Sequence, residues 1–409
     1  MEATPQTQHH EVLIIGAGSA GITVAAQLLD AENPPEVALL DPSQKHYYQP
    51  LWTLVGGGAA TKEETERDMA DYIPWGATWI QDAAASFDPD ANTVTTRQGH
   101  MLTYDYLVVC PGIQLNWDAV PGMKETLGTH GVCSNYAYDT CDYTWETLQR
   151  VAEKPGPIRA LFSQPAGAIK CGGAPQKIMY LAADYLRKHG RLSETDIHFF
   201  TPGSVIFGVK KFAKTLNQVL DRYGITPHFF HELIEVRGDT QEAVFRVSGG
   251  DGQPAEQVEK FDMLHVVPPQ SAPDFVRNSP LASEAGWVDV DKYTLQHVRY
   301  PNVFGLGDAG STPNAKTGAA IRKQAPVVTH NLLQLRRAGA LPQPKTYNGY
   351  ASCPLVTGYG KLVLAEFDYN NQPDPSFPFD TSQERYSMYV LKKDLLPQMY
   401  WHGMLKGRA

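Results

Sequence analysis

Apolar positions near the start of the chain alternate with turn and helix signals in a regular way. The apolar run Glu11–Ile15 leads into a glycine-rich stretch, a helical pattern of apolar residues covers Ile22–Leu29, and a second apolar run, Val37–Leu40, follows. Short apolar runs joined by a helical period are typical of parallel strands connected by a helix. The pattern therefore predicts a strand–helix–strand unit with a tight turn after its first strand.

The turn itself has the composition of a dinucleotide-binding loop. Gly16, Gly18 and Gly21 follow the GxGxxG pattern, and Asp41 comes directly after the second apolar run, 20 residues beyond Gly21. Glycines let backbone amides approach a pyrophosphate at the start of a helix, and an acidic residue at this distance can bind a ribose hydroxyl. Because strand, loop, helix and acid agree, the sequence predicts that this unit binds a dinucleotide.

The same alternation continues along the chain. Asp308 lies at the end of a late apolar run, where sheets of this kind bind ligands, and it could accept a hydrogen bond from a ribityl hydroxyl. A helical pattern opens at Lys316, and helix N-terminal amides beside this lysine would stabilise negative charge on a ligand. Further strands are predicted at 104–109, 158–162, 197–201 and 302–307, and a further helix at 177–188.

The predicted fold is α/β, with two Rossmann-like dinucleotide-binding domains of the glutathione reductase type and a small C-terminal module. We expect the first domain at 10–124 and 291–345, an inserted second domain at 125–290, and the C-terminal module at 346–409. These boundaries rest on a second run of strand and helix alternation within the insertion and on the aromatics and prolines of the last segment.

A cysteine stands in the second domain where another dinucleotide loop would be expected. Phe162–Gly167, after the strand at Ile158, does not supply GxGxxG, and Cys171 follows within Lys170–Pro175. A thiol can collect two electrons from a sulfur substrate by forming a disulfide with another cysteine and passing the electrons to a neighbouring flavin. The candidate partner is Cys353, 182 residues downstream.

Charge and cysteine usage exclude several other classes of protein. The formal charge is −9 and no dense Lys/Arg stretch occurs, which argues against nucleic acid as a partner. Five cysteines are an odd number for a disulfide framework, and no CxxC metal spacing occurs. Cys110, Cys133 and Cys141 are therefore expected as small buried thiols. No metal site is predicted, because His228 and His231 would fall on opposite faces of one strand.

The two ends of the chain bear on membrane association. No apolar run approaches the ~20 residues of a membrane-spanning helix, and Met1–Gln6 has neither the pattern of a secretory signal nor that of a transit peptide. The ending from Tyr386 to Arg408 combines apolar and basic residues, which Pro397 would divide into two short helices. This composition predicts an amphipathic tail on a membrane surface. Packing on the core or in a dimer interface is the alternative.

Three stretches carry a resemblance to a known family: His46–Pro50, Ile169–Tyr180 and Ser352–Tyr359. Together with the loop at Gly16 and the late Asp308, they resemble sulfide:quinone oxidoreductase in its type II, mitochondrial-like branch, within the two-dinucleotide-binding-domain flavoprotein superfamily. The resemblance extends from about residue 11 almost to the C-terminus. It implies an FAD cofactor, hydrogen sulfide as the electron donor, and a membrane quinone, ubiquinone, as the acceptor.

The resemblance also assigns roles to residues. It places the redox pair on Cys171 and Cys353, joined as a disulfide or through a bridging sulfur, with Cys353 as the persulfide carrier and Cys171 as the donor to the flavin. The sulfane sulfur would leave on a small acceptor or as polysulfide. The expected FAD-binding residues are Gly16, Gly18, Ser19, Ala20, Gly21, Asp41, Gln49, Ala84, Asp308, Lys316, Thr317, Gly318 and Ala319.

Two other functions remain open at this point. A type II NADH:quinone oxidoreductase would need a second phosphate loop, and a non-catalytic flavin and dithiol redox sensor would use the same cysteines without turnover. The tail and the resemblance together predict a peripheral, monotopic membrane protein, and because Met1–Gln6 shows no signal or transit pattern, we expect a bacterial cytoplasmic membrane. They leave the oligomeric state open.

Overall fold

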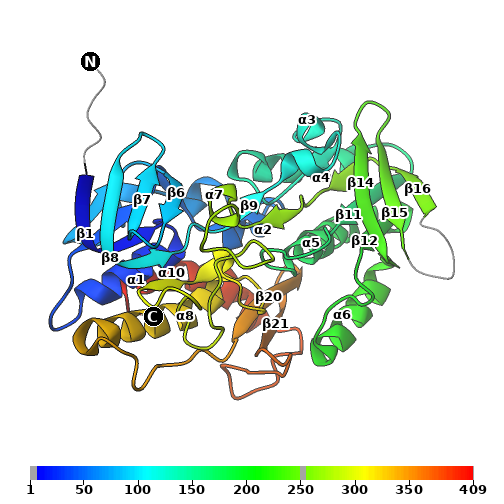
Figure 1. Ribbon diagram of the computed structural model, residues 1–409. Helices are drawn as coiled ribbons and strands as arrows, with labels where there is room; N and C mark the ends of the chain where they lie inside the picture. Colours follow the sequence, from blue (N-terminus) through cyan, green and yellow to red (C-terminus); the bar gives the residue numbers. More distant parts are fainter. Residues whose placement is uncertain (1–6, 249–254, 409) are drawn as a thin grey trace.

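The computed structural model describes residues 7–248 and 255–408, and its first sheet is built around the predicted strand–helix–strand unit (Figure 1). β1 (Thr7–Ile15) pairs in parallel with β2 (Val37–Leu40) and with β8 (Met101–Val109), and α1 (Ser19–Leu29) links β1 to β2. All of β2 is buried, as expected for an inner strand of a parallel sheet. The sheet also contains β5 (Ala77–Ile80), β6 (Ala84–Asp88), β7 (Thr93–Thr96) and β19 (Val303–Gly305).

The second sheet repeats this arrangement. β11 (Ile158–Ser163) pairs in parallel with β12 (Thr195–Thr201) and with β17 (Met263–His265), and α5 (Ala174–Lys188) links β11 to β12. An antiparallel meander packs on β12, where the rings of Phe200 and Phe245 stack with centroids 3.9 Å apart. The neighbouring elements are β10 (Val132–Cys133), β13 (Thr226–Phe229), α4 (Cys141–Glu153), α6 (Lys210–Tyr223) and the meander strands β14 (His231–Arg237), β15 (Glu242–Val247) and β16 (Ala255–Lys260).

The C-terminal part packs back onto both sheets. A hairpin of β20 (Ala351–Gly358) and β21 (Lys361–Phe367) contacts α5 of the second sheet. The long helix α8 (Gly318–Ala338) contacts α1 of the first sheet. The tail is helical, with α9 (Tyr386–Val390), a π-helical turn (Leu391–Leu395), α10 (Leu396–His402) and a final 3-10 turn (Met404–Lys406). Shorter elements are β3 (Lys45–Tyr47), β4 (Glu66–Asp68), β9 (Gln114–Leu115), β18 (Gln270–Ser271), α2 (Trp52–Val55), α3 (Met123–Thr126) and α7 (Asp274–Arg277).

The α/β fold class is confirmed, and the predicted strands lie where the apolar runs placed them. α1 begins at Ser19, three residues before the predicted Ile22, because its first turn consists of small residues that carry no apolar period. The division of the chain at residues 125, 291 and 346 stays a prediction.

The tail differs from the predicted pair of helices lying on a surface. Pro397 lies in the first turn of α10, directly after the π-helical turn, and the helical run continues from Tyr386 to His402. Tyr400, Trp401, Met404 and Leu405 are buried in the apolar core that also contains α1. Within residues 7–248 and 255–408, no helix is both long and apolar enough to cross a membrane.

The two histidines of the HFFH sequence also differ from their predicted placement. The chain turns at Phe230, which has a φ of 60°, so His228 lies near the end of β13 and His231 begins β14. Their rings lie 5.4 Å apart by centroid instead of on opposite faces of one strand. In the described part of the chain, no group of three or more His, Cys, Asp or Glu residues is arranged to hold a metal ion.

Candidate active site

Cys171 lies in the loop between β11 and α5, in a backbone conformation that is rare for a residue with a side chain. Its φ is 53°, in the left-handed region. Its amide donates to the Lys316 carbonyl at 2.9 Å, and its own carbonyl accepts from the Ala174 amide at 2.7 Å. A conformation of this kind persists where the surrounding structure holds it, and such residues concentrate at functional sites.

Cys353 reaches the same place from the C-terminal hairpin. It lies on β20 and is buried, and β20 packs against α5. Both cysteines are free thiols, and the largest influence on the pKa of each is the side chain of the other, so the two thiols are neighbours. The structure therefore brings together the two cysteines that the sequence separates by 182 residues.

The negative charge of this pair rests on Cys171. The hydrogen bond from Cys353 holds the pKa of Cys171 well below its ordinary value, and Lys177 adds to the effect against the opposing influence of burial. The Lys177 ammonium nitrogen lies 3.2 Å from the Cys171 sulfur. The same hydrogen bond, together with burial, raises the pKa of Cys353 well above its ordinary value. Cys171 is thus the thiolate of the pair, and Cys353 is the thiol.

Two buried lysines flank the pair. Sequence reasoning assigned no role to Lys177, and it counted Lys392 among the basic tail residues that would face lipid headgroups, which is wrong because Lys392 is buried. Lys177 lies in the first turns of α5, and Lys392 lies in the π-helical turn of the tail. The amine of Lys392 donates to the Pro50 carbonyl at 2.5 Å. Burial, and then repulsion by Lys177, lowers the pKa of Lys392 to about 7. Lys392 can therefore gain and lose a proton near neutral pH beside the cysteines.

The signals for these two lysines differ. Lys177 and Asp184 are buried charged residues on either side of the apolar stretch Ile178–Ala183 of α5, and a charge in a buried helix is a recognisable sign of function. Lys392 has no such signal. Lys392 lies in the tail, distant in sequence from both cysteines, and only the tertiary packing of the π-helical turn places it beside the cysteine pair.

Residues of the first sheet border the cysteine loop. Lys170 and Lys316 form an isolated parallel bridge, and the Lys170 amine lies 3.8 Å from an Asp308 carboxylate oxygen. The Lys170 amide donates to the side-chain oxygen of Gln270 at 2.7 Å. Asp308 and Lys316, both predicted from their positions after a strand and before a helix, therefore lie next to the cysteine pair.

Lys316 and Thr317 form the entry to α8. The Lys316 amine donates to the Gly310 carbonyl at 2.9 Å and lies 3.8 Å from the centre of the Trp287 ring. Burial lowers the pKa of Lys316 to about 8. Thr317 caps the helix, since its hydroxyl accepts from the Ala320 amide at 3.2 Å. The N-terminal amides of this 21-residue helix start immediately beyond the cysteine loop.

The dinucleotide loop between β1 and α1 has the shape that its glycines predict. Gly16 has a φ of 99°, and a Cβ there would lie 2.7 Å from the Cys110 carbonyl oxygen. No atom of the described residues lies within 4 Å of a Cβ placed on Gly18, so this side of the loop is open. Asp41 accepts from the Ala17 amide at 2.7 Å. Open space before the amides of a helix N-terminus fits a pyrophosphate group.

The predicted cofactor residues thus fall into two groups. One is the loop at Gly16–Gly21 with Asp41, and the other is Asp308 with Lys316–Ala319 beside the cysteines. Gln49 precedes Pro50, whose carbonyl accepts a hydrogen bond from Lys392. Ala84 begins β6 and is buried in the apolar cluster that contains Ile15 and Leu40 of the first sheet, whereas Cys171 and Cys353 are absent from that cluster.

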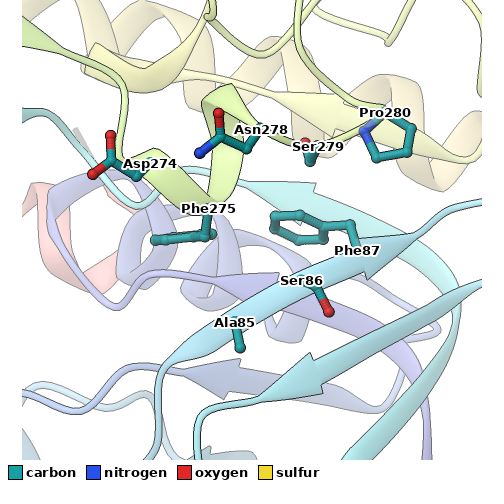
Figure 2. A pocket seen from close by; sticks show the side chains of 8 residues that line it. All are labelled: Ala85, Ser86, Phe87, Asp274, Phe275, Asn278, Ser279 and Pro280. Carbon is teal, nitrogen blue, oxygen red and sulfur yellow. The ribbon is translucent and has the colours of Figure 1, made fainter.

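A surface cavity lies apart from both groups. It has a volume of about 300 Å³ and is formed by β6 and α7, with the rings of Phe87 and Phe275 close together, as Figure 2 shows. Ala84 directly precedes its first lining residue, Ala85, and neither redox cysteine lines it. The cavity therefore does not belong to the candidate active site.

Comparisons with known proteins agree with this geometry. The family model for pyridine nucleotide-disulphide oxidoreductases matches residues 10–146. The mitochondrial sulfide:quinone oxidoreductase of Dictyostelium discoideum is 47% identical over 97% of this chain and 86% of that protein. The mitochondrial sulfide:quinone oxidoreductase of Mus musculus is 44% identical over 98% of this chain and 87% of that protein.

The chain belongs to the sulfide:quinone oxidoreductase family. The crystal structure of the sulfide:quinone oxidoreductase from Aquifex aeolicus superimposes with a TM-score of 0.81 at 20% identity, covering 98% of this chain and 92% of that one, which shows the same fold. Membership makes the chain an oxidoreductase and implies a flavin-type cofactor. Both relatives carry mitochondrial names, so they give no support to the bacterial membrane expected from the sequence.

Proposed function

We propose that this protein is an FAD-dependent sulfide:quinone oxidoreductase, which oxidises sulfide to sulfane sulfur at Cys171 and Cys353 and passes the electrons to a membrane quinone such as ubiquinone. The observation that carries the proposal is the cysteine pair itself. Cys171 and Lys177 occupy the strand–loop–helix unit where a second nucleotide would otherwise bind, and Cys353 completes the pair from the C-terminal hairpin. The family relatives support the same substrates.

The charge distribution assigns the two sulfurs different roles. In the oxidised enzyme the cysteines form a disulfide, or a trisulfide with one bridging sulfur. Hydrosulfide attacks the Cys353 sulfur of the disulfide, a new S–S bond forms there, and the Cys171–Cys353 bond breaks, releasing Cys171 as a thiolate. A thiol with a lowered pKa is the better leaving group, which supports Cys171 in this role because its pKa is held low by Cys353 and Lys177.

Sulfur then leaves and the pair is oxidised again. A small nucleophilic acceptor, or further hydrosulfide, attacks the outer sulfur of the Cys353 persulfide and leaves Cys353 as a thiolate. Loss of two electrons from the two thiolates re-forms the disulfide. FAD, when bound, accepts these two electrons and delivers them to the quinone. The ammonium group of Lys177, 3.2 Å from the Cys171 sulfur, favours each thiolate state of Cys171.

The residues for FAD come from both groups of the site. The loop Gly16–Gly21 would hold the pyrophosphate, Asp41 the ribose, and Asp308 the ribityl chain. Lys316 and the N-terminal amides of α8 would stabilise negative charge at the flavin ring. The structure supports this placement because Asp308 and Lys316 lie beside the cysteine loop, where a flavin must lie to receive electrons.

Lys392 supports proton transfer at the pair. Its pKa of about 7 allows it to take the proton of an incoming hydrogen sulfide molecule at neutral pH and to release it after the sulfur has left. Its amine is held toward Pro50 by a hydrogen bond of 2.5 Å, on the side of the loop that contains Gln49. The proton would therefore be held next to the predicted flavin-binding residues.

The exposed apolar residues of the tail support peripheral contact with a membrane. Leu395 and Met399 are 53% and 44% exposed one helical turn apart, and Tyr386 is 70% exposed. Trp75 is 98% exposed in the segment after Tyr72, whose ring packs against Trp401 of the tail at 4.8 Å. Aromatic and apolar side chains of this kind enter the interfacial region of a bilayer, where a quinone would be reached.

Multiple-turnover assays separate this proposal from its two rivals. The purified protein should reduce a soluble quinone with sulfide for many cycles and should not do so with NADH. Turnover with NADH instead of sulfide would favour a type II NADH:quinone oxidoreductase. Reduction of a single equivalent of quinone, followed by arrest in the presence of a sulfur acceptor, would favour a redox sensor.

A further inference from the structure

Tyr400 belongs to the C-terminal helix α10, but its hydroxyl lies at the dinucleotide loop of the first sheet. The Tyr400 oxygen is 2.7 Å from the Ser19 hydroxyl oxygen and 2.5 Å from Nε2 of His46. Tyr400 and His46 are both buried. Ser19 is the first residue of α1, so the tail touches the helix terminus that faces the proposed pyrophosphate position.

The protonation of His46 fixes the direction of these hydrogen bonds. Burial lowers the pKa of His46 to about 4, so the ring is neutral at neutral pH and carries one N–H. We assign this N–H to Nδ1, because the Ala17 backbone interacts with the ring and Nε2 faces the Tyr400 hydroxyl, so that Nε2 is the acceptor. Tyr400 therefore donates to His46, and because its only proton is used, it accepts from Ser19.

These four residues form what we call the Tyr400 chain: Ser19, Tyr400, His46 and Ala17. In this assignment the donors run in one direction, from the Ser19 hydroxyl through Tyr400 to His46, whose ring interacts with the Ala17 backbone. Ala17 and Ser19 are the two neighbours of Gly18, the residue at the open side of the loop. The Tyr400 chain thus connects the two flanks of Gly18, while Asp41 holds the Ala17 amide at 2.7 Å.

The aromatic residues around the Tyr400 chain strengthen its hydrogen bonds. The ring of Tyr400 packs against Tyr48 at 4.6 Å and Trp401 at 5.0 Å, and Tyr72 packs against Trp401 at 4.8 Å. A buried aromatic cluster has a low local dielectric constant, in which hydrogen bonds are stronger and reinforce one another. The same cluster makes an unpaired partner costly, so loss of one member should disturb the others.

We propose that Tyr400 and His46 are positioning residues for FAD, which hold residues 17–19 in the conformation that presents the loop amides to the pyrophosphate. The inference rests on the proposed binding of FAD at this loop. It gives the buried half of the tail a function distinct from membrane contact: α10 completes the cofactor site from behind, without touching the cofactor.

The test compares two tyrosine substitutions in the same aromatic cluster. Tyr400→Phe keeps the ring and removes the hydroxyl that joins Ser19 to His46. Tyr72→Phe removes a hydroxyl that takes no part in the chain. Titration of each apoprotein with FAD, followed by flavin fluorescence, should show binding about tenfold weaker for Tyr400→Phe and unchanged for Tyr72→Phe.

A second measurement works without cofactor. Hydrogen exchange of the amides in residues 17–21 of the apoprotein should be faster in Tyr400→Phe than in Tyr72→Phe, while exchange in the second sheet stays equal. His46→Leu should weaken FAD binding as Tyr400→Phe does, and the double variant should be no worse than either single one, because each change breaks the same chain.

The outcomes are distinct. Wild-type affinity for FAD in Tyr400→Phe, or additive losses in the double variant, would overturn the inference and leave the proposed function intact. Failure of the wild-type protein to bind FAD would overturn the proposed function together with the inference. Faster exchange throughout Tyr400→Phe, beyond residues 17–21, would show a general packing defect and also contradict the positioning role.

Discussion

The molecule contains the same strand–loop–helix unit twice, and we propose that one copy holds FAD while the other holds the redox-active thiol. β1 lies between β2 and β8, with α1 as the connection, and β11 lies between β12 and β17, with α5 as the connection. In the first unit three residues, 16–18, separate strand from helix, and in the second unit ten residues, 164–173, do so.

The length and chemistry of the two loops explain the difference in function. The short loop is held close to the sheet by Gly16 and leaves open space in front of Gly18, which suits a phosphate group. The longer loop lifts Cys171 into a left-handed conformation and directs it toward Lys177 and Cys353. A single topology can thus hold a dinucleotide or a redox-active thiol, depending on the residues between strand and helix.

Filling the open side of the first loop tests whether this loop binds the pyrophosphate. Gly18→Val should prevent binding of the pyrophosphate, so that purified protein retains less than about a tenth of the flavin of the wild type. Flavin absorbance per protein measures this directly. Gly208→Val is the matched control, because Gly208 is also open and lies outside the loop. Full flavin content in Gly18→Val would contradict the assignment of this loop.

The second loop can be weakened by removing its charge. Lys177→Met takes away the ammonium group 3.2 Å from Cys171 and leaves the hydrogen bond from Cys353. The pKa of Cys171 should rise, so that its thiolate is protonated at a higher pH. The acid limb of the pH profile of sulfide-driven flavin reduction should therefore move up by about one pH unit, and the rate at pH values below that limb should fall about tenfold. Lys188→Met, on the same helix, is the control. An unmoved acid limb would exclude a role for Lys177 in setting the pKa.

Substitutions in the tail can test membrane contact without changing either of the two loops. Leu395→Ser with Met399→Ser should lower turnover with membrane-embedded quinone about threefold and leave sulfide-driven flavin reduction unchanged, because both side chains are exposed. Deleting the tail from Leu395 would be a poor test, since it also removes the buried Tyr400 and Trp401. Val298→Ser, exposed elsewhere, is the control. If the double variant binds liposomes and turns over quinone as the wild type does, Leu395 and Met399 do not contact the membrane.

The smallest effect is expected at the thiols outside the second loop. Burial raises the pKa of Cys133 and of Cys141 to about 12, so both remain protonated and unreactive at neutral pH. Cys133→Ser and Cys141→Ser should each keep sulfide-dependent quinone reduction within about twofold of the wild type. A loss of more than tenfold in either variant, in a folded protein with full flavin, would place a third cysteine in the reaction.

The sequence predicted the first unit more completely than the second because its signals are local. Strand, glycines, helix and Asp41 all lie within residues 11–41, and β2 has the predicted bounds. Cys353 was a candidate partner of Cys171 from the sequence, but the resemblance to a family was needed to assign the pair, because no local pattern connects positions 182 residues apart. Sequence reasoning missed the roles of Lys392 and Tyr400 and the turn at Phe230 for a related reason. Each depends on how distant segments pack, and the spacing of apolar residues along the sequence does not reveal that packing.

The central claim is that electrons enter through the second loop as sulfide at the cysteine pair, and not as NADH. Anaerobic stopped-flow absorbance of the flavin, with sulfide or NADH as the reductant, tests it most directly in the wild type, Cys171→Ser and Cys353→Ser. The account predicts rapid bleaching of the wild type by sulfide alone and less than about a tenth of that rate in either variant, a loss of at least ~1.4 kcal/mol in transition-state stabilisation, with flavin still bound. Bleaching of both variants by sulfide at the wild-type rate, or bleaching of the wild type by NADH, would contradict it.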